Sequence, residues 1–282
     1  MHFSDRLLTS ICRVNAPTCI GLDPVLEKLP ASVRAEHWEP VAAIRAFCHG
    51  VIQASIPHAA AIKFQSACFE RYGGPGLTIM RELINEAALS GLTILLDAKR
   101  GDIGISADHY AAATVALGAH AITANAYLGP STIEPYLKAG LGVFILVRTS
   151  NPDSDGIQST KLADGRTVAE MFADYTAALG DKNMGTMGLS NVGAVVGATK
   201  AEDSLNLRKR MPHQPFLIPG YGAQGGTAQD IKAMLAGNSI TSGHMLVTAS
   251  RSVIYAFKPD DNNWQSSVGA AAKQFAQELR DI

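Results

Sequence analysis

The sequence has few cysteines and no cysteine motif. Among its 282 residues, Cys12, Cys19, Cys48 and Cys68 are widely spaced, and no two of them form a C-x-x-C pair. Structural zinc sites and disulfide frameworks need closely spaced or numerous cysteines. We therefore expect no metal site and no disulfide, and we predict that the four cysteines are buried, reduced thiols.

Long runs of charged or of apolar residues are also missing. The 24 basic and 25 acidic residues give a formal net charge of -1, which argues against a nucleic-acid-binding face or a polybasic membrane patch. No segment reaches the ~18 apolar residues of a membrane span. Asp5, Arg6 and Arg13 interrupt the apolar stretch that a signal peptide would need. We expect a cytoplasmic protein with no nucleic-acid or membrane partner, in which a local site holds any anionic ligand.

The chain contains eight short apolar segments that end in polar or glycine-rich residues. Amphipathic segments with apolar residues three and four apart separate them, and these are predicted helices. Such alternation predicts an α/β fold with a parallel sheet, and eight units suit a TIM (β/α)8 barrel of ~250 residues. No linker divides the chain, so we predict a single catalytic domain over residues 1–282. The predicted strands span 17–23, 59–65, 92–99, 119–127, 142–150, 192–199, 216–222 and 244–251, and the clearest predicted helices span 41–55, 76–90, 106–118, 168–180 and 227–237.

A doubly wound open sheet is the competing architecture, because it also alternates strands and helices. Polar residues at the carboxyl ends of the predicted strands favour the barrel. A closed barrel gathers strand ends around one mouth, whereas an open sheet spreads them along an edge. These polar residues are Asp23, Lys63, Asp97, Lys99, Asn125, Ser150 and Arg251.

Cap and turn residues predict several boundaries. Ser106 and Thr227 are expected to open helices, and Gly118 and Gly237 are expected to end them. The segment 151–165 is rich in Ser, Asp and Gly and has no apolar period, so it is predicted to be a long surface loop. Loops of this length are often lids or binding loops, and disorder is the alternative.

Alternating charges lie in the segment around the third predicted strand. Asp97 and Lys99 are two residues apart, so their side chains are expected to leave one face of the strand, toward the barrel interior. Lys63 would enter the same space from the neighbouring strand, and Asp102 follows in the next loop. These charges could instead be structural, with Asp102 or Ser106 capping a helix. Four charges at one mouth favour function, because buried ion networks are seldom the cheapest route to stability.

The loops after the seventh and eighth predicted strands have the features of a phosphate site. Barrels frequently bind phosphate at this place. Glycines allow backbone N–H groups to approach an anion, Thr227 begins a helix whose positive end faces it, and Arg251 adds a charged donor. The glycines of the first loop are Gly220, Gly222, Gly225 and Gly226.

These segments resemble the orotidine monophosphate decarboxylase family. DAKRGDIGISA, residues 97–107, is similar to the D-x-K-R-G-D-I-G-x-[TS]-A signature of its second bacterial group, with Ser106 where threonine is common. GLDP, IKFQ, TSNP, PGYGAQGG and SRSVIYA accompany it in the family's order. Each lies at a predicted strand end, and together they span nearly the whole chain.

The resemblance implies decarboxylation of orotidine 5'-monophosphate to uridine 5'-monophosphate, the last step of de novo UMP synthesis, without metal or other cofactor. Lys63, Asp97, Lys99 and Asp102 would form the family's tetrad, with Lys99 as general acid. Asp102 would reach into the active site of the partner subunit of a homodimer. By the same resemblance, phosphate would contact Gln224 and Arg251, the ribose hydroxyls would contact Asp23 and Ser106, and the pyrimidine ring would contact Ser150.

Two other functions remain open for such a sequence. A metal-dependent sugar-phosphate decarboxylase or aldolase would use the same barrel, but it would need an acidic ligand where this chain has Lys63. A non-catalytic nucleotide-binding barrel would need only the fold and a phosphate site. Such a protein has no evident need for two lysines and two aspartates at one mouth. The sequence assigns no role to Arg100.

Overall fold

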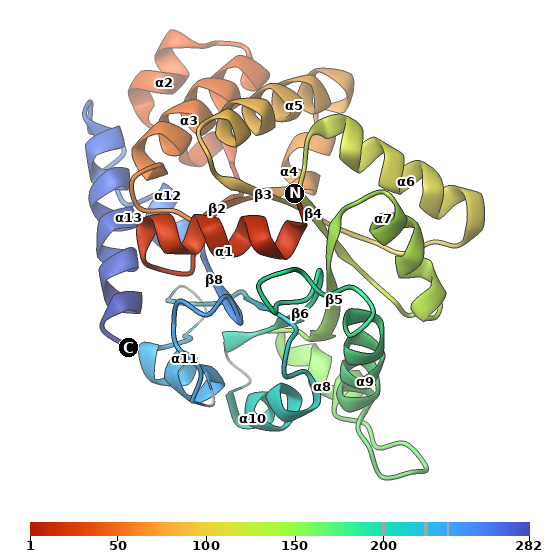
Figure 1. Cartoon of the computed structure of the whole chain (residues 1–282). Helices are drawn as coiled ribbons and strands as arrows, with labels where there is room; N and C mark the ends of the chain where they lie inside the picture. Colours follow the sequence, from red (N-terminus) through yellow and green to blue (C-terminus); the bar gives the residue numbers. More distant parts are fainter. Residues whose placement is uncertain (199–200, 223–224, 236) are drawn as a thin grey trace.

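Eight parallel strands form a closed barrel in the computed structural model, which describes residues 1–198, 201–222, 225–235 and 237–282. Each strand pairs with the next along the chain, and β8 closes the ring by pairing with β1 (Figure 1). That closing pair excludes the open sheet and confirms the predicted (β/α)8 barrel. The strands are β1 (Thr18–Leu22), β2 (Ala61–Gln65), β3 (Thr93–Arg100), β4 (Ala121–Ala124), β5 (Gly142–Arg148), β6 (Val192–Val196), β7 (Phe216–Ile218) and β8 (Met245–Ala249).

Helices surround the barrel (Figure 1). The five predicted helices are confirmed as α3, α5, α6, α9 and α11, with ends that differ by a few residues. The α-helices are α1 (Phe3–Val14), α2 (Ala31–Glu36), α3 (Pro40–Ser55), α4 (Ser66–Glu70), α5 (Gly73–Leu89), α6 (Gly104–Leu117), α7 (Glu134–Lys138), α8 (Asp155–Gln158), α9 (Val168–Gly180), α10 (Ala201–Arg210), α11 (Ala228–Leu235), α12 (Arg251–Ile254) and α13 (Trp264–Arg280). The short 3-10 helices are η1 (Leu26–Lys28), η2 (Pro130–Ile133) and η3 (Pro152–Ser154).

The larger apolar core lies between the strands and the surrounding helices. Helix α3 shows why these segments are helical: Ile44, Phe47 and Val51 recur at three- and four-residue spacing and are fully buried. Phe47 packs 5.3 Å, centroid to centroid, from Trp264 of α13. Each such side chain contributes roughly 1.5–3 kcal/mol when it is buried completely. This layer holds the strands in position from outside.

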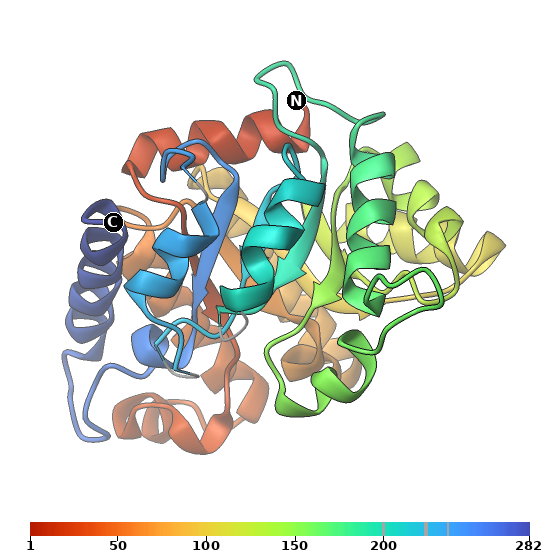
Figure 2. The same ribbon diagram turned by 90° about the horizontal axis from the view of Figure 1, so that it is seen from below.

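A second apolar core fills the barrel at the end where the strands begin. Phe3, Leu7 and Ile11 of α1 pack together with inward side chains such as Leu95 and Phe144. Figure 2 shows α1 across one end of the barrel, opposite the end near α2. The strands begin at the end that α1 covers, so the interior is filled there. A ligand site is left at the carboxyl ends of the strands.

The predicted helix boundaries are partly confirmed. Helix α6 begins at Gly104, whose φ of 55° suits glycine, so the prediction that Ser106 opens it is wrong. Gly118 ends α6 with a left-handed φ of 88°, as predicted. At α11, the Thr227 hydroxyl accepts a bond from the Asp230 amide, and the Asp230 carboxylate accepts one from the Thr227 amide. These reciprocal bonds confirm the cap at Thr227.

The segment 151–165 is a surface segment with more structure than its composition suggested. It contains η3 and α8, and most of its residues are exposed. Its first half is held to β5 by Arg148, the last residue of that strand, which the sequence pattern did not single out. A search for apolar periodicity cannot detect a segment that is ordered by polar contacts.

The four cysteines differ in burial. All four cysteines are free; Cys19 and Cys48 are buried, but Cys68 is half-buried and Cys12 is exposed. The prediction that all four are buried is therefore wrong.

Within the described residues, no helix has the length and apolar character that crossing a membrane requires.

Candidate active site

A cavity of about 630 Å³ opens at the carboxyl ends of the strands. Residues from most of the strand ends meet there, as the barrel interpretation predicted. Among the described residues, the cavity is lined by Asp23, Lys63, Gln65, Asp97, Lys99, Thr123, Leu146, Thr149, Ser150, Asn151, Gln158, Val195, Leu217, Pro219, Gly220, Tyr221, Thr248, Ser250 and Arg251.

The two-residue period of the strands places the charged groups. Leu95 of β3 belongs to the inner core, and Asp97 and Lys99 follow it at intervals of two. Successive side chains of a strand alternate between faces, so all three point inward. Lys63 follows inner-core residue Ala61 of β2 in the same way. The prediction that Asp97 and Lys99 share one face with Lys63 beside them is confirmed.

Asp97 lies between two ammonium groups. Its Oδ2 is 2.7 Å from Lys63 Nζ, and its Oδ1 is 2.6 Å from Lys99 Nζ. The side chains of Lys63 and Asp97 are only 6% and 10% exposed, whereas that of Lys99 is 47% exposed. Lys63 is thus buried in an ion pair, and Lys99 presents its charge to the cavity.

The pKa values of the buried pair move in the directions that keep both groups charged. Burial alone would raise the pKa of Asp97, but Lys63 and Lys99 outweigh it and hold that pKa well below 3.8. Burial alone would lower the pKa of Lys63, but the charges of Asp97 and Asp23 raise it above 10.5. The fixed negative charge beside Lys99 is therefore present at every physiological pH.

The backbone at Lys99 adopts a strained conformation. Its φ is 48°, in the left-handed region, and the pairing of β3 with β4 shifts register between Leu96 and Arg100. A non-glycine residue in this region costs roughly 1–3 kcal/mol. Thr123 of β4 supports this bend, because its Oγ1 accepts from the Lys99 amide at 3.0 Å and donates to Asp97 Oδ1 at 2.9 Å.

Four of the other predicted site residues also line the cavity. Asp23 Oδ1 lies 3.7 Å from Lys63 Nζ. Ser150 and Gly220 lie on the wall, and Arg251 stands at the first position of α12. Arg251 is paired with no carboxylate among the residues that the structure describes. Its charge is available for an anionic ligand.

Asp102, Ser106 and Asn125 do not line the cavity of their own chain. Asp102 Oδ1 accepts from the Ile103 amide at 2.8 Å, beside the start of α6. Ser106 is in the first turn of α6, and Asn125 Oδ1 accepts from the Tyr127 amide. Within one chain, the expectation that Asn125 joins the other strand-end residues at the mouth is therefore wrong.

The predicted phosphate loop is a tight turn. The amides of Gly222, Gly225 and Gly226 donate to carbonyl groups within the loop, at 2.9–3.1 Å. Of the four predicted glycines, only Gly220 lines the cavity, and Gln224 lies outside the described residues. The Tyr221 hydroxyl anchors the loop by donating to Glu278 of α13 at 2.8 Å.

Sequence reasoning missed several polar residues of the cavity, including Thr123, Gln158 and Thr248. Thr123 and Thr248 each lie two residues beyond an inner-core residue of their strand, Ala121 and Leu246. The two-residue period that found Asp97 could therefore have found both threonines. Gln158 is on α8 and has no such signal.

Arg100 holds the segment that carries the charges. Its guanidinium forms an ion pair with Glu70 of α4 and lies 5.2 Å from the centre of the Tyr110 ring on α6. Arg100 is therefore bound to neighbouring helices. No group of three or more His, Cys, Asp or Glu within the described ranges has a geometry suited to a metal ion.

Comparison with known proteins identifies the family. The model described as "Orotidine 5'-phosphate decarboxylase / HUMPS family" matches residues 17–262. The chain belongs to this family. Orotidine 5'-phosphate decarboxylase of Rhodopirellula baltica is 36% identical to it, with 99% of each chain covered. That of Deinococcus radiodurans is 40% identical, with 93% of this chain and 90% of the relative covered.

Solved structures agree with this assignment. The Leishmania donovani OMP decarboxylase superposes with a TM-score of 0.78 and 32% sequence identity, and the match covers 100% of both chains. The family barrel is therefore present over the whole length of this chain.

Proposed function

We propose that this chain, acting over residues 1–282 as a single catalytic domain, decarboxylates orotidine 5'-monophosphate to uridine 5'-monophosphate. The observation that carries the proposal is the charge arrangement: Lys99 faces a cavity while Asp97 holds it at 2.6 Å and Lys63 neutralises the other oxygen of Asp97. Family membership and relatives named as orotidine 5'-phosphate decarboxylases support the choice of substrate.

The cavity offers groups for each part of this nucleotide. Arg251 and the loop that contains Gly220 would bind the phosphate, because a guanidinium can make charge-assisted bonds to a phosphate. Asp23, next to Lys63, would accept bonds from ribose hydroxyls. Ser150, on the wall formed after β5, would contact the pyrimidine ring.

The reaction would need no electron acceptor outside the protein. When the bond between the ring carbon and the carboxylate breaks, carbon dioxide leaves and the electron pair stays on the ring carbon. The Lys99 ammonium would stabilise this carbanion and transfer a proton to it, and the neutral amine would regain a proton from water. Asp97, charged at neutral pH, would orient Lys99 and repel the substrate carboxylate. The chain's own residues thus account for each step without a metal or cofactor.

We also propose that the enzyme is a homodimer with shared active sites. The segment that carries Asp102 and Ser106 does not line its own cavity. Ile103, Ile105 and Tyr127 near it are 60%, 72% and 79% exposed. Exposed apolar residues that gather around a polar segment are typical of an interface. Asp102 would reach Lys99 of the other subunit, and Ser106 would reach its bound ribose.

The activity can be tested by following the ultraviolet absorbance of orotidine 5'-monophosphate after purified protein is added. We expect a decrease with the wild-type protein, no change with Lys99→Ala, and equal rates with and without a chelator. A metal-dependent sugar-phosphate enzyme would lose activity with the chelator. A non-catalytic nucleotide-binding barrel would bind the nucleotide without releasing carbon dioxide.

Sharing of the active site can be tested by mixing two inactive variants. Lys99→Ala and Asp102→Ala are expected to be inactive separately. If subunits exchange, half of the dimers are mixed, and each mixed dimer has one intact site, so about a quarter of wild-type activity returns. No recovery after exchange, checked by co-purification of two tags, would contradict the shared site.

A further inference from the structure

The proposed reaction leaves Arg148, the last residue of β5, without a role. Its side chain is only 5% exposed, although it is charged. The pairing of β5 with β6 shifts register between Leu146 and Arg148. A bulge at a strand end turns a side chain away from its regular direction. Arg148 accordingly lies among the helices beside the barrel, while Leu146 remains on the cavity wall.

The Arg148 guanidinium joins two separate parts of the chain. Nη2 lies 2.5 Å from Asp155 Oδ1 of α8, and Nε lies 2.6 Å from Asp203 Oδ2 of α10. Nη1 also donates to Ser154 Oγ at 3.1 Å, at the end of η3. A buried guanidinium is costly unless its donors are satisfied, and here three elements supply the acceptors. The segment after β5 is thereby fixed to α10.

These contacts continue to the cavity through Gln158. Gln158 Oε1 accepts from Arg148 Nη1 at 3.5 Å and from the Thr149 amide at 2.8 Å. Its Nε2 donates to Thr149 Oγ1 at 2.9 Å, and that hydroxyl donates to Asn151 Oδ1 at 2.8 Å. Gln158, Thr149 and Asn151 all line the cavity, and Thr149 and Asn151 are the sequence neighbours of Ser150.

The opposite side of Ser150 is closed by Gly197. A Cβ built on Gly197 would lie 2.8 Å from Ser150 Cα and 2.9 Å from its backbone nitrogen, closer than such atoms approach. The absence of a side chain at Gly197 therefore allows Ser150 to sit where it does. With Gly197 on one side and the bonds from Arg148 on the other, the position of the 149–151 turn is strongly restricted.

We propose that Arg148 is a positioning residue for the ring end of the substrate. It holds the segment 149–158 so that Gln158 and Ser150 form the wall against which the pyrimidine is placed, without contacting the substrate itself. This inference rests on the proposed function, because it assigns the part of the nucleotide that this wall meets. Misplacement by about 1 Å in such a wall can lower turnover about 100-fold.

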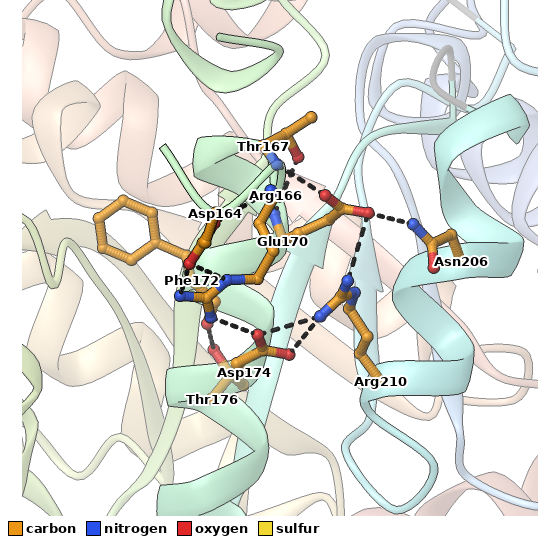
Figure 3. A network of polar contacts seen from close by, with 9 residues as sticks. All are labelled: Asp164, Arg166, Thr167, Glu170, Phe172, Asp174, Thr176, Asn206 and Arg210. Carbon is orange, nitrogen blue, oxygen red and sulfur yellow. Dashed lines mark hydrogen bonds and ion pairs between the residues drawn. The ribbon is translucent and has the colours of Figure 1, made fainter. Parts of the chain in front are cut away.

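The chain offers a control in Arg210, another arginine with two carboxylate partners, although its side chain is 27% exposed and that of Arg148 only 5%. Arg210 of α10 pairs with Asp174 at 2.8 Å and with Glu170 at 3.5 Å, both on α9 (Figure 3). Asp174 also binds Arg166 at 2.7 Å, which ties the turn before α9 to the same network. None of these residues lines the cavity. Loss of Arg210 removes comparable ion pairs without touching the 149–158 segment.

The test compares Arg148→Met, Arg148→Lys and Arg210→Met with the wild type by binding of two probes, UMP and ribose 5-phosphate. We expect Arg148→Met to raise the Kd for UMP about 10- to 100-fold and to leave the Kd for ribose 5-phosphate unchanged. Arg148→Lys should recover part of the loss, since an ammonium keeps the charge but cannot hold three elements in a fixed geometry. Arg210→Met should leave both constants unchanged.

Three outcomes would overturn the proposal: an unchanged Kd for UMP in Arg148→Met, an equal rise for both probes, or the same rise in Arg210→Met. If Arg148→Met does not fold, Asp203→Asn removes one of its two ion pairs and carries the same expectation with a smaller effect. The proposed function is checked separately by turnover of orotidine 5'-monophosphate with the wild type. If the wild type does not turn over orotidine 5'-monophosphate, the proposed function is wrong. If the wild type is active and the Arg148 variants bind UMP as the wild type does, only the proposed role of Arg148 is wrong.

Discussion

Replacement of Asp97 by asparagine should separate the structural cost of the buried charges from their catalytic role. Asp97 keeps its shape in Asp97→Asn but loses the charge that lies 2.7 Å from Lys63 and 2.6 Å from Lys99. Lys99 is half exposed and can be solvated by water. Lys63 is buried, and its nearest remaining carboxylate is Asp23 at 3.7 Å.

The magnitude follows from these distances. At an effective dielectric constant of about 20, a pair at 2.7 Å interacts by about 6 kcal/mol and a pair at 3.7 Å by about 4.5 kcal/mol. Desolvation offsets most of this attraction, so removal of one partner of a buried pair costs about 3–5 kcal/mol. Because asparagine keeps a hydrogen-bond acceptor and Asp23 remains, we expect Asp97→Asn to lower the free energy of unfolding by about 3 kcal/mol.

The informative comparison is the double variant Lys63→Met/Asp97→Asn. Removing the Lys63 ammonium, which has lost its partner, should raise the free energy of unfolding by at least about 1.5 kcal/mol relative to Asp97→Asn alone. The reason is that a buried charge without a partner costs more than the absence of both charges. Urea unfolding measures this difference. Turnover should stay at least about 100-fold below wild type in both variants. If the double variant were as unstable as the sum of the two single variants, the reasoning about the buried pair would be refuted.

Three other residues give sharp expectations. Burial, with a contribution from Arg6, lowers the pKa of His120 to about 4, and its Nδ1 accepts from the Ile94 amide. Between about pH 6.5 and 4 the unfolded chain therefore binds more protons than the folded chain. The free energy of unfolding should fall by ~1–2 kcal/mol as pH decreases through this window, a value that allows for the partial exposure of His120. His120→Asn should reduce this dependence on pH, as measured by urea unfolding at several pH values. Arg251→Ala should impair turnover of the nucleotide far more than of the phosphate-free nucleoside, and equal losses in steady-state kinetics would contradict phosphate binding. Thr123→Val removes the support of Asp97 and Lys99, so kcat should fall about tenfold with little change in KM, and an unchanged kcat would argue against that support.

Local periodicity accounts for the part of the site that the sequence predicted. Asp97 and Lys99 share a face because strand side chains alternate, and Lys63 lies beside them because consecutive strands of a barrel are neighbours. Both rules operate over a few residues or between adjacent units. Asp23 and Arg251 were predicted at the cavity by a third rule, that the carboxyl ends of the strands of a closed barrel meet at one mouth.

Features that depend on irregular backbone or distant contacts were not predictable in this way. The pairing of β3 with β4 shifts register after Leu96, and that of β5 with β6 shifts after Leu146, where Arg148 turns away from the cavity; periodicity does not indicate where such an irregularity occurs. Helix α6 begins at Gly104, two residues before Ser106, and Gly104 has a positive φ that the sequence pattern does not indicate. The first half of the segment 151–165 is held by Arg148, whose other partner, Asp203, lies 55 residues away in sequence.

The most direct test of the central claim uses the product alone. If Lys99 can protonate the ring carbanion, it must also remove that proton in reverse, so wild-type protein in heavy water should exchange deuterium into UMP at the carbon that carried the carboxylate, as seen by proton NMR. We predict exchange with the wild type and none above background with Lys99→Ala, at UMP concentrations that saturate both. Equal exchange with the two proteins would contradict the assignment of Lys99 as the group that stabilises and protonates the carbanion.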